Sequence, residues 1–181
     1  PIGVAGVSPK SDTLVLAGER GWIPMSINLV PASVLKSHWE AVESGARRTG
    51  LIPDRSAWRI AREVYVAETD ELARKEALEG VLRRDFERYF RPLLTHTKQM
   101  DLMKTDPEMP DSDVTAEYLV DNIWIVGDPD GVAGKLRRMH RDVGDFGVLL
   151  AMGHEWEPRD RWLNSTELLI NKVMPRLADL D

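Results

Sequence analysis

The feature of this sequence that most restricts its fold is a regular alternation of short apolar runs with longer stretches of helical periodicity. The apolar runs cover residues 2–6, 22–29, 58–67 and 146–152. Between them, apolar residues recur every three or four positions, which is typical of helices that bury one face. Repeated strand–helix units predict an α/β fold with parallel strands, right-handed crossovers and outer helices.

Residues with strong capping preferences predict where the helices begin and end. Ser8 followed by Pro9 predicts the start of a helix that continues over 13–20, and Gly21 predicts its end. Further helices are expected at 33–48, 69–89, 130–141 and 165–177, with Ser33, Asp128 and either Asn164 or Ser165 as caps.

Residues 91–117 interrupt this alternation. They contain Pro92, Pro107 and Pro110 and more acidic than basic residues. A long insertion within a compact α/β fold is usually a lid, a partner-binding segment or a disordered stretch. We therefore expect a mobile excursion at about 91–117 within a single domain that covers 1–181.

Composition excludes several classes of protein. The formal net charge is -6, which argues against a general nucleic-acid binder because such proteins need clustered excess Lys and Arg. No apolar run approaches the ~20 residues of a membrane span. The chain has no Cys, which excludes disulfides and thiolate metal sites. We expect a cytoplasmic protein with no membrane and no nucleic-acid partner.

The turn after the first apolar run is a candidate anion site. Ligands of parallel α/β folds bind at the carboxyl ends of the strands, where helix N-termini also point. Gly6, Val7, Ser8 and Ser11 occupy such a position, and Lys10 adds a positive charge. Amides at a helix N-terminus and nearby hydroxyls can hold a phosphate. The same residues also fit an ordinary capped helix start, so both interpretations stay open.

A second candidate position follows the last apolar run. Met152 ends that run, and His154 and Glu155 come two and three residues later. A His at a strand end can act as an acid, a base or a metal ligand. The other histidines lie at unrelated spacings, so we expect no metal site and assign His154 to the wall of a pocket.

Three segments resemble the C-terminal half of the bacterial-luciferase-like, flavin-dependent monooxygenase family. Residues 2–11, with 16–22, resemble its fifth strand and the following helix. Residues 124–132, followed by 146–152, resemble the start of a late helix and the eighth strand. Residues 171–175 resemble the terminal helix. These segments occur in the family's order along nearly the whole chain.

The resemblance implies a TIM (β/α)8 barrel, a fold of ~250 residues. It implies that this chain supplies only strands five to eight, that the N-terminal half of the barrel is missing, and that 91–117 is the mobile active-site loop. A half barrel has open strand edges at 2–6 and 146–152, and open edges invite pairing. We therefore expect a homo-oligomer or association with the N-terminal half.

The resemblance also implies a function. The chain would be part of a monooxygenase that uses reduced FMN, supplied by a separate flavin reductase, to insert one oxygen atom of O2 into a hydrophobic aldehyde, terpene or alkane. Gly6, Val7, Ser8 and Ser11 would bind the FMN phosphate. The pocket wall would include Trp22, Met25, Met152 and His154, whereas the family's usual catalytic His belongs to the missing half, so no catalytic residue is assigned.

Three alternatives remain at this point. Some relatives use F420 in place of FMN. A second possibility is a non-catalytic partner subunit with the same fold. The third is a small stand-alone α/β binding module, which predicts a monomer whose first strand lies at a protected edge.

Overall fold

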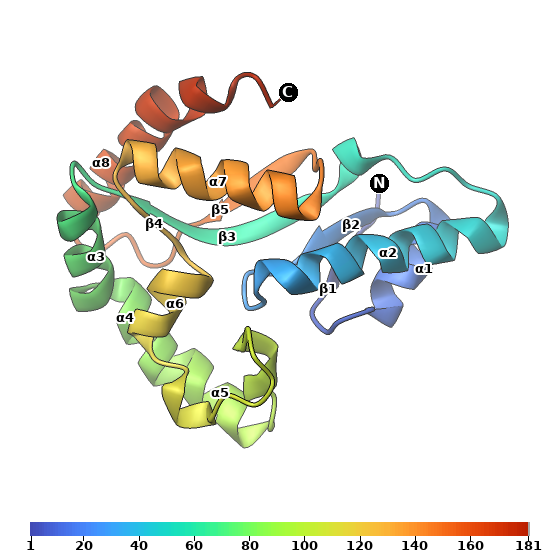
Figure 1. Ribbon diagram of the computed structural model, residues 1–181, viewed down its shortest axis with the longest axis horizontal. Coiled ribbons are helices and arrows are strands. Elements are labelled where there is room, and N and C mark those ends of the chain that lie inside the picture. Colours follow the sequence, from blue (N-terminus) through green and yellow to red (C-terminus); the bar gives the residue numbers. More distant parts are fainter. Residues whose placement is uncertain (181) are drawn as a thin grey trace. The chain divides into compact units, whose positions relative to one another are not determined.

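The computed structural model describes residues 1–180 and divides into two compact units. The first unit consists of Pro1–Arg62 and Met139–Ala151, and the second of Glu63–Arg138 and the chain from Met152 onward. Both contain strands and the helices that follow them (Figure 1). No helix among residues 1–180 is both long and apolar enough to cross a membrane.

Residues 1–180 contain five strands, and every pairing with a defined register is parallel. In the first unit β1 pairs with β2, and β2 pairs with the start of β3. In the second unit the end of β3 pairs with β4. β5 pairs with β3, and the Gly147 and Val148 amides donate to the Trp58 carbonyl. The bounds are β1 Gly3–Gly6, β2 Ile23–Ser26, β3 Arg59–Val66, β4 Ile125–Gly127 and β5 Val148–Met152.

The parallel α/β architecture is confirmed, but the expectation of four strands is wrong. β4 is the additional strand, and it is only three residues long. So short a segment is not long enough to show a strand periodicity, and its neighbours in the sequence are helical.

In the part of the chain that the structure describes, eight α-helices connect or follow these strands. Two π-helical segments, Phe86–Phe90 and Leu169–Val173, continue α4 and α8. Short 3-10 turns cover Arg55–Ala57, Met100–Met103, Asp111–Asp113 and Met174–Leu177. The helices are α1 Asp12–Arg20, α2 Ala32–Thr49, α3 Asp70–Glu79, α4 Val81–Asp85, α5 Arg91–His96, α6 Ala116–Asn122, α7 Pro129–Val143 and α8 Arg159–Leu168.

The predicted caps of α1 and α2 are partly wrong. α1 has Ser11 at its N-cap instead of Ser8, because Lys10 has a φ of 53° and turns the chain before the helix begins. α2 has Pro31 at its N-cap instead of Ser33. Gly21 ends α1 in the left-handed conformation, with a φ of 63°, as predicted.

The expectation of one helix over 69–89 is also wrong. Thr69 is the N-cap of α3, and its hydroxyl accepts from the Leu72 amide. Gly80 then adopts an extended conformation and separates α3 from α4. The last helix begins at Arg159, not at 165, because Ser165 lies inside α8 and its hydroxyl accepts from the Val66 amide at 2.8 Å.

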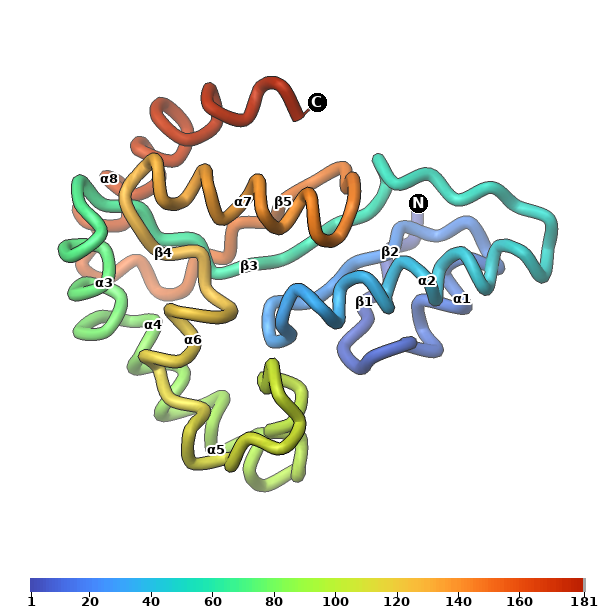
Figure 2. Tube along the Cα trace, in the orientation of Figure 1, coloured from blue at the N-terminus to red at the C-terminus, as the bar shows by residue number. Residues whose placement is uncertain are grey.

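The first unit is built around a close crossing of α1 and α2, which lie side by side in Figures 1 and 2. Gly18 faces the Val42 carbonyl, and Gly45 faces the Val15 carbonyl. The buried rings of Trp39 and Trp58 meet nearby, with centroids 5.3 Å apart. The absence of side chains at the two glycines lets the helix backbones touch.

The second unit contains the segment predicted as an excursion, which Figure 2 traces in green and yellow. Short helices fill it, and Met100 and Met103 are buried. Lys104 forms ion pairs with Asp101 and Asp111. The segment therefore contains buried apolar side chains, whereas its mobility stays a prediction.

Candidate functional site

The turn after β1 combines one buried hydroxyl, that of Ser11, with exposed polar groups. Ser11 is buried, and its hydroxyl lies 2.8 Å from that of Thr13. Thr13 donates its own proton to the Ala5 carbonyl at 2.7 Å, so the Ser11 hydroxyl donates to Thr13. Ser8 is exposed. The Ser8 hydroxyl thus faces solvent, whereas that of Ser11 holds the turn together.

Gly6 serves packing in this turn. A Cβ at this position would lie 2.4 Å from Leu14 Cδ1. The space beside Gly6 is therefore filled by the first turn of α1, and Val7 next to it is half-buried.

The start of α1 presents backbone donors to solvent. The amides of Asp12 and Thr13 are in the first turn, and neither has a partner in the part of the chain that the structure describes. They carry the positive end of the helix dipole. Ser8, the side chain of Lys10 and these amides fit a phosphate, whereas the Asp12 carboxylate opposes one.

A buried histidine holds this turn from α2. His38 is fully buried; its Nε2 lies 3.0 Å from the Ser8 carbonyl oxygen, and its Nδ1 lies 2.9 Å from Ser26 Oγ. Because a carbonyl only accepts, Nε2 carries the proton and Nδ1 accepts from the Ser26 hydroxyl. Ser26 in turn accepts from Trp58 Nε1 at 3.0 Å. Burial, and to a smaller extent the charge of Arg62, lower the pKa of His38, which keeps the imidazole neutral.

The two predicted pocket residues on or beside β2 lie at different ends of the strand. Ser26 faces α2 and Met25 precedes it, so strand alternation places Met25 on the opposite face, with the half-buried Ile23. Trp22 precedes the strand and lines a hollow of about 210 Å³ with Trp39 and Leu51. The structure therefore does not bring Trp22 together with the carboxyl end of β2.

The second unit places His154 in a charged cluster after β5. Its Nδ1 lies 2.8 Å from Asp85, and its Nε2 lies 3.7 Å from Glu63. The side chains of His154 and Glu63 are only 12% and 3% exposed. Arg84 pairs with Glu155 at 2.6 Å, so α4 holds the segment after Met152 at two points.

The carboxylates decide the charge of His154. Glu63 has the largest effect on the pKa of His154 and raises it, and Asp85 raises it further. Together they outweigh burial, which lowers the pKa. A charged imidazole donates from both nitrogens and suits a position between two carboxylates. The cluster therefore links β3, α4 and the segment after β5 most strongly when His154 is protonated.

A His154→Gln variant should show over which pH range this cluster stabilises the fold. Because the folded pKa exceeds the ordinary value of about 6.5, the stabilisation is complete below that pH and is lost as the pH rises through the folded pKa. Each unit of pKa difference corresponds to about 1.4 kcal/mol. Urea unfolding between about pH 5.5 and 8.5 should show a steeper loss of stability with rising pH in the wild type than in the variant, and equal slopes would contradict the assignment.

His38, whose pKa is lowered, has the opposite effect on stability. It destabilises the fold as the pH falls below about 6.5.

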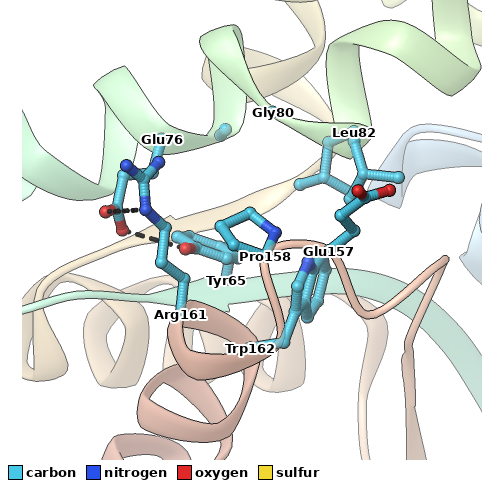
Figure 3. A pocket seen from close by; sticks show the side chains of 10 residues that line it. Tyr65, Glu76, Gly80, Leu82, Glu157, Pro158, Arg161 and Trp162 are labelled. Atoms are coloured by element: carbon cyan, nitrogen blue, oxygen red, sulfur yellow. Dashed lines mark hydrogen bonds and ion pairs between the residues drawn. The ribbon is translucent and has the colours of Figure 1, made fainter.

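Figure 3 shows a hollow in the second unit that the sequence did not predict. Tyr65 donates to Glu76 at 2.9 Å, and Arg161 pairs with the same carboxylate at 3.1 Å. Pro158 and Trp162 also line it. Its volume of about 10 Å³ holds about one water molecule, so it cannot hold an organic substrate.

Several site residues were missed at the level of the sequence. His38 lies on the apolar stripe of α2 with Leu35 and Val42, a position that predicts burial and hence a need for partners. Arg62 and Glu63 are adjacent charged residues in the middle of β3, between apolar residues on both sides, which is the corresponding signal in that strand. Thr13 and Asp85 carried no signal that separates them from ordinary helix residues. No group of three or more His, Asp or Glu that could hold a metal occurs within 1–180.

Comparison with known proteins finds similarity along nearly the whole chain. Residues 1–145 match the family described as luciferase-like monooxygenase. The chain is 34% identical over 177 residues to 3,6-diketocamphane 1,6-monooxygenase of Pseudomonas putida, which covers 97% of this chain and 47% of that protein. It is 30% identical over 175 residues to limonene 1,2-monooxygenase of Rhodococcus erythropolis, which covers 94% of this chain and 42% of that protein.

A solved structure shows the same similarity in three dimensions. The oxygenating constituent of 3,6-diketocamphane monooxygenase from Pseudomonas putida, a type II Baeyer-Villiger monooxygenase in complex with FMN, superposes with a TM-score of 0.88 at 35% identity. The match covers 97% of this chain and 48% of that one. The chain thus spans about half the length of the relatives it matches.

Proposed function

We propose that this chain, which belongs to the luciferase-like monooxygenase family, supplies the phosphate-binding side of an FMN-dependent monooxygenase. The observation that carries the proposal is the turn after β1. There the Ser8 hydroxyl and the free amides of Asp12 and Thr13 lie at the carboxyl end of a parallel strand. The FMN bound by the oxygenating constituent of 3,6-diketocamphane monooxygenase supports the choice of FMN over F420.

The residues of this chain would bind and orient the cofactor. The amides of Asp12 and Thr13 and the Ser8 hydroxyl would donate to the phosphate, and Lys10 would offset its charge. Reduced FMN would supply the two electrons with which O2 delivers one oxygen atom to the substrate and the other to water. The chain's own catalytic residues remain unassigned.

The substrate class we propose is a hydrophobic terpenoid. The names of the relatives, which act on diketocamphanes and limonene, support it. Ile23 and Met25 on β2, with Ile27 just after it, form a half-buried apolar row that would contribute to the wall of such a pocket. Met152, the last residue of β5, and His154 belong to the second unit, and Trp22 lies at the other end of its strand.

We also propose that the chain works as one half of a barrel. The relatives are about twice its length, and Ile2, immediately before β1, is 54% exposed. An N-terminal half would pair with β1 and cover the apolar row on β2. A separate flavin reductase would deliver the reduced cofactor.

The test is oxygen transfer by the complete protein that carries this chain. With FMN, a flavin reductase, NADH and 18O2, the product of a diketocamphane or of limonene should contain one 18O atom by mass spectrometry. The 181-residue chain alone should bind FMN weakly and form no product. Turnover by the chain alone would contradict the half-barrel proposal. FMN binding without turnover by the complete protein would favour a non-catalytic partner, and turnover only with F420 would replace the cofactor.

A further inference from the structure

We propose that His38 is a positioning residue for FMN, because it holds the Ser8 carbonyl inward and thereby turns the donors of the β1–α1 turn toward the phosphate. The inference rests on the proposed function. His38 is buried in α2 and would not touch the cofactor itself. It would act through the turn, and so control how tightly the phosphate of FMN is bound.

The turn is held by two consecutive residues of α2. His38 Nε2 donates to the Ser8 carbonyl at 3.0 Å, and Ser37 Oγ accepts from the Lys10 amide at 3.2 Å. The Ser37 hydroxyl is itself fixed, because it donates to the Val34 carbonyl at 2.7 Å. One turn of α2 therefore sets both the inward carbonyl and the left-handed conformation at Lys10.

The direction of the Ser8 carbonyl matters for an anion. A phosphate is attracted by N–H groups and repelled by carbonyl oxygens, so a turn binds it only when its carbonyls point elsewhere. Without the donor from His38, the Ser8 peptide is free to rotate and to present its oxygen beside the Asp12 and Thr13 amides.

The network behind His38 favours this role over simple packing. The side chain is fully buried, and an apolar residue would fill the space without needing partners. Instead, hydrogen bonds run from Trp58 through Ser26 to His38 and on to Ser8. The neutral imidazole, kept so by burial, donates at Nε2 and accepts at Nδ1, as this chain of bonds requires.

Glutamine and asparagine at position 38 test the two hydrogen bonds of the imidazole one at a time. In His38→Gln the side-chain amide reaches the position of Nε2 and can still donate to Ser8. In His38→Asn it reaches only the position of Nδ1, so the contact with Ser26 survives and that with Ser8 is lost. His38→Leu removes both contacts, and Val42→Ala, a buried change on the same helix, is the control for general destabilisation.

The readout is the affinity of the complete protein for FMN and for riboflavin, which lacks the phosphate. For His38→Asn and His38→Leu we expect the Kd for FMN to rise about tenfold and that for riboflavin to change less than about twofold. His38→Gln should stay near the wild type. Val42→Ala should lower the melting temperature and leave the ratio of the two constants unchanged.

The outcomes separate the two proposals. Equal weakening of FMN and riboflavin binding by His38→Asn, or equal loss in the Gln and Asn variants, would overturn the role of His38. If the wild-type protein binds FMN no more tightly than riboflavin, the phosphate site itself is wrong, and the proposed function fails with it. If His38→Leu does not fold, the Gln and Asn pair decides.

Discussion

Replacing Gly45 with alanine is expected to cost about 2 kcal/mol or more of the free energy of unfolding. The new Cβ would lie 1.9 Å from the Val15 carbonyl oxygen and 3.0 Å from the Glu19 amide nitrogen. Both are backbone atoms of α1, so only a separation of the two helices can relieve the clash. The gain of about 1 kcal/mol in helix propensity is too small to compensate.

The matched control is Gly134→Ala in α7. A Cβ there meets nothing within 4 Å, so only the propensity gain of up to about 1 kcal/mol remains. Urea denaturation of both variants should give midpoints that move in opposite directions. A Gly45→Ala protein as stable as the wild type would show that α1 and α2 do not cross as closely as the structure indicates. Because α2 also holds Ser8, the Gly45 variant should lose FMN affinity as well.

Placing a carboxylate in the β1–α1 turn is expected to remove FMN binding selectively. Ser8 is exposed, so Ser8→Asp should leave the fold intact. A like charge beside the phosphate costs several kcal/mol, so the Kd for FMN should rise about 100-fold. Riboflavin carries no phosphate, and its Kd should change less than about twofold. Fluorescence titration of the complete protein with both flavins measures the difference.

Asp12→Asn is a control in which FMN binding should become stronger instead of weaker. The Asp12 carboxylate is exposed at the start of α1, and removing its charge should strengthen FMN binding about two- to threefold. Riboflavin binding should again stay constant. If neither substitution changes FMN binding, the phosphate does not lie at this turn.

Periodicity predicted most of the architecture. The strands at β1, β2, β3 and β5 and the helix end at Gly21 all depend on residues close together in the chain. The errors lie where distant residues compete with local preference. Ser8 is a good N-cap by type, but His38 and Ser37 hold its turn in a conformation that delays the helix to Asp12.

The candidate site was predicted only in part for the same reason. The sequence places Ser8 and the expected start of a helix after an apolar strand, which makes the turn a candidate anion site. It does not indicate that the Ser11 hydroxyl points inward to Thr13 or that Trp22 lies at the opposite end of β2. The direction of a side chain depends on the register of the strand and on its neighbours, which are distant in sequence.

The sequence by itself determined a parallel α/β chain with an exposed polar turn after its first strand, because periodicity and capping act over a few residues. Tertiary structure alone decided which groups at that turn face solvent and which are buried. His38 approaches Ser8 from 30 residues away, and His154 meets Asp85 from 69 residues away. Such contacts form only when helices and strands pack, and packing energy is shared among many residues that no local pattern connects.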